Sequence, residues 1–198
     1  AAGCAGLARL CRGLHDPTWL EPARELLALA VDCAGQLGDG KEVLFAKRVL
    51  LLWEIIVQPE AAAAKVAAEL RSLPAMTGVH AASAIHLQRY QLLIPYRSLL
   101  MGRPCLPPTG YETPLAREHW VAALCHKYLG AIQASQGAAV QARQHFAIAW
   151  ELLRRERQSQ REFMALTVLL QAGDSLLGSA EDAYARDCLS QALNALPR

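Results

Sequence analysis

The residues best suited to chemistry stand in the second half of the chain, where His119, Cys125 and His126 fall within eight positions. On a helix, positions 119 and 126 share one face and position 125 is rotated away from it. A zinc site generally needs four ligands, and a cysteine nucleophile needs a facing base and a third, orienting group. Adjacent residues of a helix do not face each other, so we interpret these three as packing residues and expect no metal and no catalytic residue.

Two further histidines, His80 and His86, are six residues apart on one expected helix and point in different directions. The chain contains no glycine-rich phosphate loop, no GxSxG elbow and no HExxH pair. The sequence therefore predicts a protein that is not an enzyme and that needs no cofactor.

Bulk composition excludes other classes. Hydrophobic residues make up 53% of the 198 and the formal charge is +2, values typical of a folded protein and not of a disordered one. Residues 1–102 carry 10 basic against 9 acidic residues, as do residues 103–198. Neither half is a basic arm, so no direct contact with nucleic acid is expected.

The longest apolar run, Val49 to Val57, is interrupted by Glu54 and is far shorter than the roughly 20 residues of a membrane span. No membrane association is expected. The six cysteines form no CxxC pair, which favours reduced, mostly buried thiols in an intracellular protein, cytoplasmic or nuclear. The N-terminus has neither an initiating Met nor a signal-peptide pattern, so we interpret the chain as a fragment of a longer protein.

Apolar residues recur with helical spacing and nothing alternates with period two for long, so strands are not expected. Pro95 should kink or end the helix that contains it. The predicted helices are 4–14, 20–37, 41–57, 59–73, 78–94, 115–136, 139–158, 160–177 and 181–196. Residues 102–114, rich in Pro and Gly, predict a connector within one continuous array, the alternative being a boundary between two domains.

Small residues follow a strict order between Cys125 and Leu153. Ala142, Phe146 and Ala149 are separated by four and three residues, so they share one helix face on which the ring lies between two flat positions. Leu129 and Gly130 place a bulky residue beside a flat one on the preceding helix, and Gly137 permits the left-handed backbone of a turn. This order predicts two antiparallel helices packed closely together.

The pattern resembles the tetratricopeptide repeat (TPR), a family of helix–turn–helix units of about 34 residues. With Ala123 as first position, the six residues named above, from Leu129 to Ala149, fall on signature positions. Two positions depart from the pattern, because His126 stands where Trp is usual and Gln133 where Tyr is usual. A second unit is expected to begin 43 residues later, near Leu166. It has Leu189 in place of the aromatic residue and Ala180 in place of the turn glycine, and its other matches are Gly173, Ala185, Ala192 and Pro197.

The resemblance implies an all-α fold: a right-handed superhelical array of antiparallel helix pairs, or TPR-like α-solenoid. Residues 1–101 would form degenerate helical repeats, 102–114 the connector and 115–198 the TPR-like pairs. At least three stacked pairs are expected, because one pair cannot bury its own apolar face.

The resemblance also suggests where a partner would bind. Lys127 stands at the position of a lysine that clamps a peptide carboxylate in some family members, but Ala131 replaces the asparagine of that clamp, so chaperone-tail binding is not predicted. The groove side of the helix predicted at 115–136 would comprise Lys127, Ala131, Ala134 and Ser135. This surface suits either a partner segment or packing against the next helix pair. The charged stretch that begins with Arg154 and Arg155 is either a solvated helix end or a contact for an acidic partner.

Together these observations predict a non-catalytic scaffold that presents a concave helical groove to another protein or peptide. Self-association of the chain is compatible with this prediction. The alternative is a ligand-sensing, self-associating helical-repeat domain of a large transcription regulator, similar to the maltose-regulator type. In that hypothesis a small molecule binds inside the superhelix, and the tryptophans are either pocket walls or core anchors: Trp19, Trp53, Trp120 and Trp150.

Overall fold

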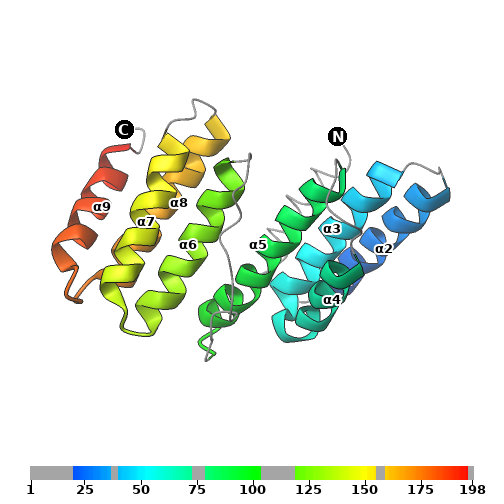
Figure 1. The fold of residues 1–198 in the computed structure, drawn as a ribbon, viewed down its shortest axis with the longest axis horizontal. Coiled ribbons are helices and arrows are strands. Elements are labelled where there is room, and N and C mark those ends of the chain that lie inside the picture. Colours follow the sequence, from blue (N-terminus) through cyan, green and yellow to red (C-terminus); the bar gives the residue numbers. More distant parts are fainter. Residues whose placement is uncertain (1–19, 37–39, 73–78, 104–118, 155–158, 196–198) are drawn as a thin grey trace. The chain divides into compact units, whose positions relative to one another are not determined.

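The structure is a computed structural model that describes residues 20–36, 40–72, 79–103, 119–154 and 159–195 (Figure 1). Every regular element in these residues is a helix, which confirms the all-α prediction. The elements are α2 (Leu20–Gln36), α3 (Gly40–Val57), α4 (Pro59–Ser72), α5 (Val79–Leu100), α6 (His119–Ser135), α7 (Ala139–Arg154), α8 (Ser159–Leu176) and α9 (Asp182–Ala195). The helix expected at 4–14 and the connector from residue 104 onward lie outside the described residues.

The chain divides into two compact units, residues 1–83 and residues 84–198. In the first unit α3 packs against both α2 and α4, and it buries Leu51, Trp53 and Ile55. Glu54, which interrupts the apolar run of α3, accepts a hydrogen bond from Lys65 of α4 at 2.6 Å. The apolar run is therefore partly buried in the first unit, and Glu54 joins it to α4. None of the described helices combines the length and the apolar character needed to cross a lipid bilayer.

The second unit contains two helical hairpins, α6–α7 and α8–α9, and α8 also packs against α6 and α7 (Figure 1). Gly137 ends α6 with a φ of 78°. The Ala138 N–H donates to the Gln133 carbonyl and the Gly137 N–H to the Ala134 carbonyl, the two bonds of a Schellman cap. The predicted reversal at Gly137 is thus confirmed.

The second hairpin corrects one expectation. Its left-handed turn residue is Gly178, with a φ of 76°, and not the position of Ala180. Helix α8 ends at Leu176, so five residues join it to α9, whereas three join α6 to α7. The Gly178 N–H donates to Asp182 Oδ1 at 2.7 Å, which ties this longer turn to the start of α9.

Helix α5 corrects another expectation, because it does not end at Pro95 but runs on to Leu100. Tyr90 and Leu92 are buried before the proline, and Tyr96 is buried after it. The Tyr96 ring stacks on Tyr128 of α6, and its hydroxyl donates to Gln171 Oε1 of α8 at 2.7 Å. These contacts hold the last turn helical despite the backbone donor that proline lacks.

Candidate functional site

The hairpin α6–α7 is as closely packed as its small residues predict. Ala142, Phe146 and Ala149 are completely buried. A Cβ added at Gly130 would lie 3.0 Å from the Phe146 ring, so only glycine allows this approach without displacing the ring. The order of small residues and one aromatic therefore serves to bring two helices into close contact.

The hairpin α8–α9 repeats these contacts at a constant offset of 43 residues. Ala185 and Ala192 are completely buried, as Ala142 and Ala149 are. A Cβ at Gly173 would lie 2.3 Å from Leu189 Cγ, so Leu189 fills the position of Phe146. The two hairpins are equivalent structural units, and positions 43 residues apart can be compared directly.

The four residues predicted on α6 differ in how far they are buried, and one of them contacts α8. Lys127 Nζ donates to Thr167 Oγ1 at 3.0 Å, and burial lowers the pKa of this lysine to about 8. Ala131 is only 1% exposed. Ala134 is half-buried and Ser135 is exposed, with its hydroxyl donating to the Ile132 carbonyl. Lys127 is thus bonded to the next helix pair, Ala131 is buried, and Ala134 and Ser135 remain at least partly exposed.

Arg154 lies at the exposed end of α7, whereas Arg155 lies outside the described residues. The Arg154 guanidinium makes two bonds to the Glu151 carboxylate, from Nε at 2.5 Å and from Nη2 at 3.0 Å. These interactions raise the pKa of Arg154. An acidic partner would have to compete with Glu151 for this side chain.

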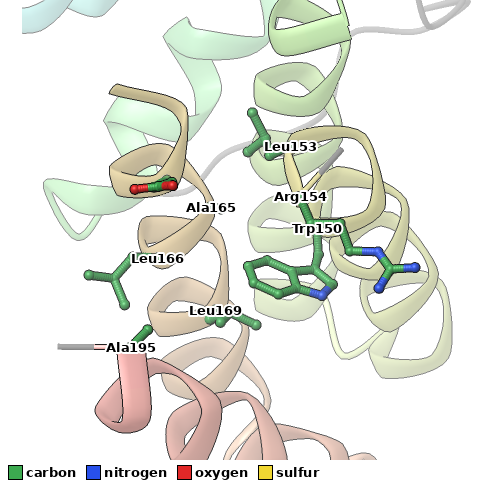
Figure 2. A pocket seen from close by; sticks show the side chains of 8 residues that line it. Trp150, Leu153, Arg154, Ala165, Leu166, Leu169 and Ala195 are labelled. Atoms are coloured by element: carbon green, nitrogen blue, oxygen red, sulfur yellow. The ribbon is translucent and has the colours of Figure 1, made fainter. Parts of the chain in front are cut away.

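Arg154 also borders a cavity of about 230 Å³ between the ends of α7, α8 and α9 (Figure 2). The walls are mainly apolar, and Arg154 and Glu162 supply one charge of each sign. The other lining residues are Trp150, Leu153, Ala165, Leu166, Leu169 and Ala195. A cavity of this kind can accept one apolar side chain or a small apolar molecule.

The sequence analysis missed an exposed apolar row along α8. Phe163 and Leu170 of α8 are 67% and 44% exposed, and Leu177, the residue directly after α8, is 54% exposed. The Leu177 N–H still donates to the Gly173 carbonyl, so Leu177 continues the helical path. We refer to these three residues as the α8 stripe. Their spacing of seven residues places them on one face, since two helical turns bring the chain back to nearly the same direction. That spacing is visible in the sequence, but it becomes informative only once the buried face of α8 is known.

The α8 stripe corresponds to the groove predicted on α6. Leu170 stands 43 residues after Lys127, and Leu177 stands 43 residues after Ala134. Asp174, which is 43 residues after Ala131, is exposed between the two leucines. In the described residues Leu170 and Leu177 are exposed, whereas the equivalent Lys127 is bonded to Thr167 of α8.

Of the groups considered for chemistry, the structure describes the side chains of His86, Cys125 and His126. Among the described residues, no three His, Cys, Asp or Glu side chains lie close enough to hold a metal ion together. Cys125 is fully buried. His126 contacts His145 of α7 through its Nδ1 atom. His86 packs against the Trp120 ring, with the ring centroids 5.6 Å apart.

No family model matches the chain, and comparisons with curated proteins and with solved structures found no match either.

Proposed function

We propose that the chain is a non-catalytic scaffold, a TPR-like array of helix pairs that binds another protein along the α8 stripe. The observation that carries this proposal is the exposure of three large apolar side chains in line on one helix face. From Phe163 to Leu177 the stripe extends about 21 Å along the helix axis. Ordered rows of exposed apolar side chains mark interaction surfaces more often than isolated ones do.

The environment of the α8 stripe indicates what kind of segment would fit. Asp174 lies between its two leucines and Glu162 lies next to Phe163, and both carboxylates are exposed. An amphipathic helix with apolar residues every seven positions and basic residues beside them would match both the row and the charges. Because α8 is fixed by α6, α7 and α9, binding would cost little ordering entropy on the scaffold side.

The proposal is tested with Leu170→Asp, which places a charge at the middle of the α8 stripe. The matched control is Leu193→Asp on α9, where the leucine is 69% exposed but has no place in the stripe. A protein captured from a native lysate by the wild-type chain and by Leu193→Asp should be lost from Leu170→Asp. Capture by all three chains alike would contradict the assignment of this surface.

The cavity beside Arg154 favours a second candidate, a ligand-sensing domain that changes its self-association when an apolar small molecule binds. Of the described tryptophans, only Trp150 lines that cavity; Trp53 is buried in the first unit. A metabolite screen monitored by tryptophan fluorescence would give a saturable change in the wild-type chain and none in Trp150→Phe. A flat response in the wild-type chain would leave the scaffold as the better explanation.

A further inference from the structure

Arg89 of α5 is a cation that is buried without an anion beside it. The residue is only 8% exposed, and its Nε has no hydrogen-bond partner. Within the part of the chain that the structure describes, Arg89 takes part in no ion pair. Helices α5 and α6 contain neither Asp nor Glu. Because a charge loses its hydration on burial, buried arginines are as a rule paired with an anion.

Aromatic rings lie close to the Arg89 guanidinium. Its Cζ atom is 4.8 Å from the centre of the Tyr90 ring and 5.6 Å from the centre of the Trp120 ring of α6. The faces of these rings attract a cation, but they carry no net charge that could neutralise it. The rings therefore explain why the guanidinium is held between the two helices, and they leave its positive charge uncompensated.

Tyr128 of α6 does not supply the missing negative charge. Burial raises the pKa of its hydroxyl to about 12, against the opposing effect of the nearby Arg89 charge. The hydroxyl is therefore neutral at pH 7 and is a hydrogen-bond donor rather than a counter-ion. The described surroundings of Arg89 thus offer rings and a phenol, and the counter-ion has to come from outside them.

We infer that Arg89 anchors a binding site for a small carboxylic acid, whose carboxylate provides the negative charge that α5 and α6 lack. The N–H groups of a guanidinium lie in one plane and match the two oxygens of a carboxylate. An apolar or aromatic body of the acid suits the Trp120 ring. Trp120 packs on His86, and both rings are half-buried, so this side of the site reaches the surface.

The test is a titration of the full chain with benzoate, followed through the indole N–H signals of the tryptophans in nuclear magnetic resonance spectra. The Trp120 signal, identified by its loss in Trp120→Phe, should shift to saturation, and the signals of Trp53 and Trp150 should not. Benzamide, which has a similar shape and no charge, should bind at least about tenfold more weakly. Equal affinity for benzamide, no saturable shift of Trp120, or binding of inorganic phosphate as tight as that of benzoate would overturn the inference.

Arg89→Met keeps an apolar stem of similar length and removes the charge. It should weaken benzoate binding at least about tenfold. The matched control is Arg97→Met, which removes a half-buried arginine of the same helix and should leave the affinity unchanged. Equal affinity of Arg89→Met and the wild type would contradict the assignment of the site.

A second measurement needs no ligand. Without benzoate, Arg89→Met should melt at a higher temperature than the wild type, because the variant no longer buries an uncompensated charge. Saturating benzoate should raise the melting temperature of the wild type and not that of Arg89→Met. A lower melting temperature of ligand-free Arg89→Met would show that the charge is compensated within the chain, and would overturn the inference.

Discussion

The hairpins α6–α7 and α8–α9 have the same packing framework and different side chains around it. Gly130 and Gly173 each face the bulky residue of the opposite helix, and two completely buried alanines flank that residue in both hairpins. Around this framework Leu189 stands at the position of Phe146, and Leu169 and Cys188 stand at the positions of His126 and His145. The small residues therefore determine how the helices approach, and the remaining positions are free to acquire separate properties.

The largest difference should appear when each bulky residue is truncated. Phe146 is completely buried, whereas Leu189 is only partly buried. Phe146→Ala should lower the free energy of unfolding by about 3–5 kcal/mol, and Leu189→Ala by about 2 kcal/mol. Chemical denaturation of both variants checks this order, and a larger loss for Leu189→Ala would mean that the second hairpin carries the core.

The two helix-facing glycines should also differ. A Cβ at Gly173 would meet Leu189 Cγ at 2.3 Å, whereas one at Gly130 would meet the edge of the Phe146 ring at 3.0 Å. Gly173→Ala should therefore destabilise the protein by about 1–3 kcal/mol, and Gly130→Ala by less.

Gly35, in helix α2, is the control for these substitutions because a Cβ there would meet nothing within 4 Å. Gly35→Ala should be neutral or stabilising by up to about 1 kcal/mol, since alanine favours the helix. Truncating Leu189 in the Gly173→Ala background should recover part of the loss. Additive losses in that double variant would argue against a direct clash.

Acid should distinguish the hairpins through the histidines. The pKa of His126 is about 4 in the folded chain against 6.5 for the free side chain, so protonation favours the unfolded state. This contribution to stability is complete above about pH 6.5 and is lost as the pH falls toward 4. The double variant His126→Leu/His145→Cys copies the second hairpin. Its melting temperature should fall less between pH 7.5 and 4.5, and an unchanged pH dependence would contradict this.

The smallest expected effect is at Lys127, which has Leu170 as its equivalent. Lys127→Leu removes a buried ammonium whose pKa is about 8, and Thr167 keeps its bond to the Met164 carbonyl. The variant should melt slightly higher than the wild type at pH 7. That advantage should shrink as the pH rises through 8 toward 10.5, because the native lysine is then neutral as well. A lower melting temperature at pH 7 would show that the lysine contributes more through its bond to Thr167 than its burial costs.

Much of the helical architecture could be predicted because its signals are local. Apolar periodicity, prolines and glycines place most helix ends within a few residues of those observed, and Gly137 ends α6 as expected. The burial of Ala142, Phe146 and Ala149 follows from their sharing one helix face. Such features depend on residues close together in the chain, where spacing and backbone preference decide the outcome.

The predictions that failed concern positions where residues far apart in the sequence determine the local structure. Pro95 lies inside a helix because Tyr128 and Gln171 hold the turn that follows it. Gly178 takes the turn because the two interhelical loops differ in length, which a fixed repeat spacing does not reveal. Likewise the side chain of Lys127 is committed to Thr167, 40 residues away. Leu170 and Leu177 stand 43 residues after Lys127 and Ala134, and their exposure becomes visible only once the packing of α8 is known.

Tyr96 has a consequence for where this polypeptide can be divided. Its stacking on Tyr128 and its bond to Gln171 connect α5 to α6 and α8 within the second unit. A fragment that starts at residue 84 keeps Tyr96 and therefore both of these contacts. One that starts at residue 115, after the Pro/Gly-rich stretch, would leave the Tyr128 ring and Gln171 without this partner, and we expect it to be the less stable of the two.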